Sequence, residues 1–129
     1  MYDELIVFES LQNVEKSLRH VLDRTSDIKS ADDFVLTPHG VDMLDVATIR
    51  LMAVGEEIKK IDKRTKGTLL SQYPEIEWKE VIGMRNFIAH DYHRVDAEVI
   101  FDAIQNDVLP LLSIIQKIIA DQKIKHNLT

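Results

Sequence analysis

Apolar residues recur along this chain at alternating spacings of four and three, which is the period of amphipathic helices with one buried face. In residues 5–22 the repeat consists of Val7, Leu11, Val14, Leu18 and Val21. No segment alternates in the manner of a strand, and the sequence contains no internal repeat. The pattern therefore predicts an all-α protein.

A second, long helix is predicted to start at Thr37 and Pro38, because an N-cap residue is followed by a proline suited to the first helical position. We expect it to end near Gly67. Its apolar positions are Leu44, Ala47, Leu51, Val54, Ile58 and Ile61. Between the first two helices, Ser30 followed by an acidic residue three positions later predicts a short helix or turn.

The next helix is predicted from Trp78 to about His90, and its core-facing residues are Val81, Met84 and Ile88. Asp96 is placed to cap the last helix, in which Pro110 should cause a kink or break near residues 107–109. The fold class that follows is an antiparallel bundle of about four to five helices.

Composition limits the classes of function. A chain of 129 residues suits one domain, 1–129, and the absence of cysteine excludes disulfides and thiolate metal sites. No apolar run approaches the roughly 20 residues that span a bilayer, and the N-terminus lacks the pattern of a secretory signal, so we expect a cytoplasmic protein without a membrane partner. With a net charge of −6, we expect any RNA contact to be local, and no DNA partner.

Chemistry is concentrated in residues 85–92, Arg-Asn-Phe-Ile-Ala-His-Asp-Tyr. Arg85 offers a permanent charge and a planar set of donors suited to phosphate, and His90 can exchange a proton near neutral pH. These residues indicate phosphodiester chemistry. By spacing alone, the more common interpretation is a solvated helix end whose cations interact favourably with the helix dipole.

The pattern of Arg85, His90 and Tyr92, together with the preceding Tyr-Pro-Glu-Ile-x-Trp of residues 73–78, resembles the HepT-like toxins of the HEPN superfamily. These are small helical ribonucleases paired with a nucleotidyltransferase antitoxin. The resemblance implies a HEPN-like bundle, a homodimer whose two facing motifs form one cleft, an RNA substrate, and the toxin role in a type VII-like toxin-antitoxin pair.

The helical spacing also favours a composite site. Lys79, Gly83, Asn86 and His90 share a stripe opposite the core face, and a mid-helix glycine often permits close approach of another backbone. We interpret this stripe as a subunit interface. Arg85 lies about 140° around the axis and roughly 7.5 Å along it from His90, so two copies would bring both groups together more readily than one.

The predicted reaction needs neither a metal nor a cofactor, because the RNA 2′-hydroxyl is the nucleophile and imidazole can transfer its proton. Arg85 would stabilise charge on the phosphate, while Asn86 and Asp91 would play supporting roles. His20, His39 and His126 lack the spacing of metal ligands.

Tyr92 has two interpretations. Its phenol either packs on the loop after the helix or is a functional hydroxyl beside the cleft, and the resemblance implies the latter, as the acceptor of AMP from the nucleotidyltransferase antitoxin.

His93 and Arg94 depart from the family pattern, and they aid RNA binding or form a solvated turn. A basic cluster near the end of the second helix most simply complements the dipole of that helix, and the alternative role is a contact with RNA or the antitoxin. The cluster comprises Lys59, Lys60, Lys63, Arg64 and Lys66.

Two other functions fit the sequence. One is a non-catalytic partner of a nucleotidyltransferase, in which Arg85 only binds phosphate of a nucleotide or substrate. The other is a helical dimer with a purely structural role. RNA cleavage by the purified chain distinguishes the ribonuclease from both.

Overall fold

The computed structural model describes residues 2–90 and 96–128, with side chains for residues 4–84 and 96–128. The elements are α1 (Tyr2–Arg24), η1 (Ala31–Phe34), α2 (Pro38–Arg64), η2 (Leu70–Gln72), α3 (Trp78–His90), α4 (Ala97–Asn106) and α5 (Val108–His126). Over these residues the protein is helical and contains no strand, which confirms the predicted fold class.

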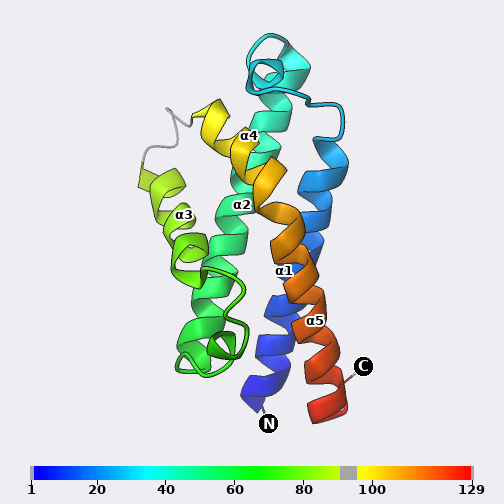
Figure 1. Ribbon diagram of the computed structural model, residues 1–129, viewed down its shortest axis with the longest axis vertical. Coiled ribbons are helices and arrows are strands. Elements are labelled where there is room, and N and C mark those ends of the chain that lie inside the picture. The colour runs from blue at the N-terminus through cyan, green and yellow to red at the C-terminus, as the bar shows by residue number, and fades with distance from the viewer. Residues whose placement is uncertain (1, 91–95, 129) are drawn as a thin grey trace.

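Three long helices form the body of the bundle. In Figure 1, α1, α2 and α5 run along the longest axis, and both chain termini lie at the same end. α1 packs between α2 and α5, whereas α3 packs mainly on α2. The helix that carries the candidate motif is therefore at one side of the bundle, held mainly by one neighbour.

The predicted apolar stripes form the core. All five stripe residues of α1 are buried, as are Ala47, Leu51, Val54, Ile58 and Ile61 of α2. Each fully buried aliphatic side chain contributes about 1.5–3 kcal/mol relative to its exposed state. Burial along these faces is therefore the main force that holds α1 against α2.

The start of α2 follows the predicted capping pattern. The hydroxyl oxygen of Thr37 accepts a hydrogen bond from the Gly40 backbone N–H at 2.9 Å, and Pro38 occupies the first turn. Gly40 has a further role that the pattern did not indicate. A Cβ at this position would overlap the Asp33 carbonyl oxygen, so glycine allows α2 to pack directly on η1.

The end of α2 lies at Arg64, whereas the sequence suggested a limit near Gly67. Lys66 adopts a left-handed conformation with φ of 53°, and Gly67 follows at 75°. The Gly67 N–H bonds to the Asp62 carbonyl at 2.9 Å and the Lys66 N–H to that of Lys63 at 3.2 Å. This is a Schellman ending, which satisfies the last carbonyls and begins before the glycine.

The short helix predicted after Ser30 is η1, but its cap differs from the expected one. The Ser30 side chain makes no capping bond. Asp33 instead accepts from the Lys29 backbone N–H at 2.8 Å, one residue earlier than a capping box requires.

The last helical region is divided as predicted. Asp96 Oδ1 accepts from the Glu98 N–H at 2.8 Å and caps α4. α4 ends at Asn106 and α5 begins at Val108, so Pro110 lies in the first turn of α5. There its missing N–H has no intrahelical acceptor, which explains why the break precedes the proline.

Among the residues that the structure describes, no helix combines the length and hydropathy needed to cross a membrane.

Candidate active site

The start of α3 is fixed by the segment that precedes it. The Trp78 indole N–H donates to the Tyr73 carbonyl oxygen at 2.9 Å. The Tyr73 hydroxyl in turn donates to Asp121 Oδ2 on α5 at 2.6 Å. This chain of contacts connects α3 to α5 through residues 73–78, so the Tyr-Pro-Glu-Ile-x-Trp segment positions the helix.

Tyr73 has a structural role, because its ring is buried and its hydroxyl is hydrogen-bonded to Asp121. Its side chain is buried, with the residue 6% exposed, and Lys117 Nζ lies 5.8 Å from the centre of its ring. Burial raises the pKa of Tyr73 from 10.0 to about 12, with additional contributions from its hydrogen bond to Asp121 and from the charges of Asp121 and Glu75. The phenol therefore stays neutral and bonded at physiological pH.

The two faces of α3 differ as the sequence predicted, as far as its side chains are described. Val81 and Met84 pack against the core as predicted, as does Ile82, whereas the side chain of the third predicted residue, Ile88, is outside the described part. Lys79 is exposed, and a Cβ added to Gly83 would meet nothing within 4 Å in the described residues. No neighbouring backbone within this part of the chain accounts for the glycine.

The motif begins one residue after Met84. Arg85, Asn86 and His90 lie in the last turns of α3, and their side chains are outside the described part. Asp91, Tyr92, His93 and Arg94 also lie outside the described residues. The structure thus confirms the helix beneath Arg85 and His90, whereas the meeting of their side chains stays a prediction.

Helical geometry nevertheless limits the motif. Continuous helix from Trp78 to His90 places Arg85 and His90 about 140° apart around the axis and roughly 7.5 Å apart along it. The backbone positions of the two residues in one copy therefore lie on different sides of the helix. A cleft to which two copies contribute stays a prediction.

The basic cluster is distant from the motif in the fold. Lys63 and Arg64 occupy the last turn of α2, beside the chain termini, whereas α3 runs from that region toward the other end of the bundle (Figure 1). Lys60 Nζ lies 3.9 Å from Glu57 on the same helix. The cluster therefore does not adjoin His90 within one chain.

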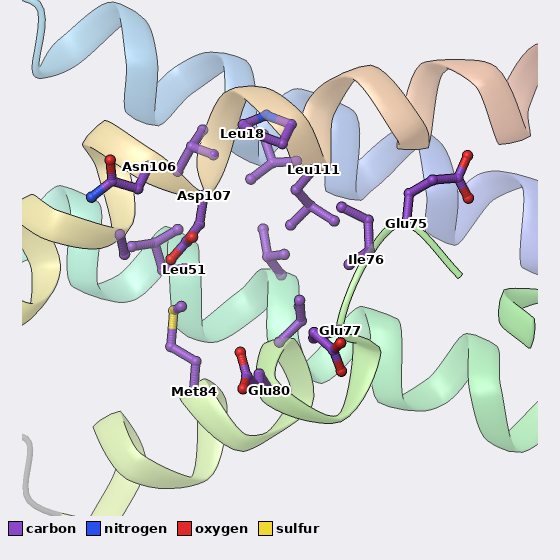
Figure 2. A pocket seen from close by; sticks show the side chains of 15 residues that line it. Leu18, Leu51, Glu75, Ile76, Glu77, Glu80, Met84, Asn106, Asp107 and Leu111 are labelled. Carbon is purple, nitrogen blue, oxygen red and sulfur yellow. The ribbon is translucent and has the colours of Figure 1, made fainter. Parts of the chain in front are cut away.

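Acidic residues lie beside α3, where sequence reasoning singled out none. Glu80 of α3 and Asp107 of the α4–α5 junction line a cavity of about 300 Å³ (Figure 2). The two are far apart in sequence and their roles depend on packing, so spacing offered no signal for them.

Two histidines of the described part lie close to carboxylates. His39 Nε2 lies 2.8 Å from Asp27 Oδ2, and His126 Nδ1 lies 3.1 Å from Glu4 Oε2. In residues 2–90 and 96–128, no group of three histidine, aspartate or glutamate side chains is arranged to hold a metal ion.

Comparison with known proteins identifies a family that this chain resembles over most of its length. A family model described as "Ribonuclease HepT-like" matches residues 14–118. The curated protein "Putative RNase TTE0752" of Caldanaerobacter subterraneus subsp. tengcongensis is 26% identical over 114 residues, which cover 88% of this chain and 94% of that protein. "Putative RNase MJ0127" of Methanocaldococcus jannaschii is 26% identical over 112 residues, covering 86% and 85%. No solved structure matches.

Proposed function

Because this chain belongs to the ribonuclease HepT-like family, we propose that it is a metal-independent endoribonuclease whose active site forms between two copies. The observation that carries the proposal is the family match over residues 14–118, which includes the whole of α3 and the Arg85, His90 and Tyr92 pattern. Two relatives named "Putative RNase", each matched over most of its length, support the same class of activity.

The proposed reaction uses the nucleophile that RNA supplies. The 2′-oxygen attacks the adjacent phosphorus, and the bond from phosphorus to the 5′-oxygen of the next nucleotide breaks. One neutral His90 accepts the proton of the 2′-hydroxyl, and the protonated His90 of the second copy donates a proton to the leaving 5′-oxygen. The products are a 2′,3′-cyclic phosphate and a free 5′-hydroxyl.

Arg85 stabilises the transition state in this scheme, because its guanidinium faces charge that grows on the non-bridging oxygens. Asn86, four residues before His90, holds the imidazole or donates to the phosphate. Asp91 orients the imidazole.

The outer face of α3 supports pairing of two copies. Glycine inside a helix costs about 0.5–1 kcal/mol relative to alanine, and the described residues of one chain give no contact that explains Gly83. Approach of a second α3 along the Lys79 and Gly83 stripe offsets that cost and brings the two motifs face to face.

RNA cleavage by the purified chain tests the proposal. Wild-type protein should cut single-stranded RNA in the presence of a chelator, and His90→Ala should lose at least about 100-fold of the rate. His39→Ala is the matched control, because His39 is an exposed histidine paired only with Asp27 at the start of α2. Intact RNA with wild-type protein, or equal cleavage by wild type and His90→Ala, contradicts the proposed activity.

We further propose that the protein is the toxin of a toxin-antitoxin pair and that a partner nucleotidyltransferase inactivates it at Tyr92. The phenol attacks the α-phosphorus of ATP, pyrophosphate leaves, and AMP remains on the tyrosine. The adduct places a negative phosphodiester and a bulky nucleoside next to His90, where they repel RNA and block the cleft.

A modification experiment distinguishes Tyr92 from the other tyrosines. Incubation with ATP and a nucleotidyltransferase encoded beside the gene should add one AMP group to wild type and none to Tyr92→Phe, as measured by mass spectrometry of the intact protein. Tyr73 is excluded as acceptor by its buried bond to Asp121. Modification that persists in Tyr92→Phe disproves this part of the proposal, and modification of a chain that never cuts RNA favours the non-catalytic alternative.

A further inference from the structure

A cavity of about 300 Å³ opens between α2, the first turns of α3 and the junction of α4 with α5 (Figure 2). Its inner wall is apolar and includes Leu51, Val54, Val81 and Leu111. This volume is at the small end of the range for ligand sites, so it suits one large apolar side chain rather than an extended ligand.

The rim of the cavity is acidic. The lining residues comprise four carboxylates and, among the described residues, no lysine, arginine or histidine. Glu75 belongs to a different environment, because Lys117 Nζ lies 4.0 Å from it and its side chain leads away from the cavity in Figure 2. Glu77, Glu80 and Asp107 remain without an ion pair to any described residue.

Asp107 is placed unusually for an aspartate. It occupies the N-cap position of α5, where such a side chain commonly accepts a hydrogen bond from the helix, yet it makes no capping bond. Its carboxylate projects from the α4–α5 junction toward α3, while that of Glu80 projects from α3 (Figure 2). Desolvation raises the pKa of Asp107, and the charge of Asp102 adds to the shift. No described cation compensates this carboxylate.

We infer that the cavity is a docking site for a partner protein segment that presents one apolar side chain flanked by lysine or arginine. The apolar wall takes the central side chain, and the flanking cations pair with Glu80 and Asp107 on opposite sides. The same carboxylates repel RNA and free anions, which excludes those ligands from this surface.

The cavity lies next to the helical turn that leads into the Arg85 and His90 motif. Met84 forms part of the cavity wall and immediately precedes Arg85 on α3. A segment bound here packs on the helical turn that leads into the motif, and it does so without entering the proposed cleft. Docking at this cavity requires no catalysis by Arg85 or His90, so the inference can be tested separately from the proposed function.

The experiment uses the full chain with ¹³C-labelled methionine methyl groups. The probe is the acetylated tripeptide amide lysine-phenylalanine-lysine, titrated to millimolar concentrations while the Met84 methyl signal is followed by NMR. The signal is assigned by its loss in Met84→Leu. A saturable shift is expected, with a dissociation constant on the order of 1 mM.

Charge and shape are separated by three further probes. The tripeptides glutamate-phenylalanine-glutamate and lysine-glycine-lysine should bind at least about fivefold more weakly, because each lacks one half of the complementarity. Hexylamine, which has an apolar body and one charge, should also bind more weakly. Hexylamine binding as tightly as the peptide identifies a small-amine site and overturns the inference.

Variants locate the binding. Glu80→Gln combined with Asp107→Asn should weaken binding of the lysine-phenylalanine-lysine peptide at least about fivefold. Within the described part of the chain, neither side chain makes a hydrogen bond that the change would remove. Glu98→Gln removes one negative charge from an exposed site on α4 outside the cavity and should leave binding unchanged. No saturable Met84 shift, equal binding by the double variant, or equal loss in Glu98→Gln contradicts the inference.

Discussion

Two side chains in residues 73–78, those of Tyr73 and Trp78, position the helix that carries the motif. Tyr73 and Trp78 contribute no chemistry to a phosphate site. Their hydrogen bonds to Asp121 and to the Tyr73 carbonyl fix where α3 begins, and hence where its later turns project. A change in these contacts should therefore affect stability and the placement of α3 before it affects the reaction itself.

The Tyr73 hydroxyl provides a pH-dependent prediction. Because the fold raises the pKa of Tyr73 from 10.0 to about 12, the neutral phenol stabilises the folded state fully below pH 10, and this contribution is lost as pH rises toward 12. Tyr73→Phe should lower the free energy of unfolding by about 1.5–3 kcal/mol near neutral pH, the range for a hydrogen bond to a charged group. Urea unfolding measures the difference, which should shrink between pH 10 and 12. A difference that is constant with pH argues against the bond to Asp121.

Residue spacing predicted some local roles and missed others for physical reasons. Thr37 and Asp96 cap their helices as expected, because capping depends on neighbours within a few residues. The pairing of Tyr73 with Asp121 joins residues 48 positions apart, so no local pattern reports it. For Arg85 and His90, the sequence predicted the helix beneath them. The proposed convergence of their side chains between two copies stays a prediction, because these side chains lie outside the described part.

Gly40 in α2 and Gly83 in α3 differ in what lies beside them. Gly40 lies in the first turn of α2, where a Cβ would overlap the Asp33 carbonyl oxygen, and Gly83 lies on the outer face of α3, where a Cβ meets nothing described within 4 Å. The same substitution at the two sites should therefore have opposite effects on the stability of the subunit.

Gly40→Ala should destabilise the subunit by about 1–3 kcal/mol, because α2 and η1 must separate. Gly83→Ala should stabilise it by about 0.5–1 kcal/mol, since alanine favours the helix and finds open space. Thermal or urea unfolding at concentrations that keep the subunits apart provides the comparison. Destabilisation by Gly83→Ala at such concentrations means that the outer face of α3 is covered within its own chain.

The same Gly83→Ala protein reports on the proposed interface. If two copies of α3 approach along this face, an added methyl group should weaken the dimer about tenfold in dissociation constant, as measured by analytical ultracentrifugation. An unchanged dimer assigns the subunit contact to another surface.

The whole molecule combines an acidic body with a local cationic motif. A net charge of −6 disfavours binding of long polyanions. The basic cluster of α2 lies at the end of the bundle where α3 begins, and α3 runs from there toward the other end (Figure 1). Apolar periodicity predicted the bundle because burial dominates its stability. The cavity beside α3 was not predicted, since it depends on how α2, α3 and the α4–α5 junction leave space between them.

The most direct test of the shared cleft is the activity of a dimer with one wild-type and one His90→Ala subunit. The two chains carry different affinity tags and are isolated by sequential purification, with a doubly tagged wild-type dimer as the control. If both His90 residues serve one reaction, the mixed dimer should cut RNA no faster than the His90→Ala homodimer. A mixed dimer with about half of the wild-type rate would show that each subunit has its own complete site, and failure to recover any doubly tagged dimer would equally contradict a cleft formed by two copies.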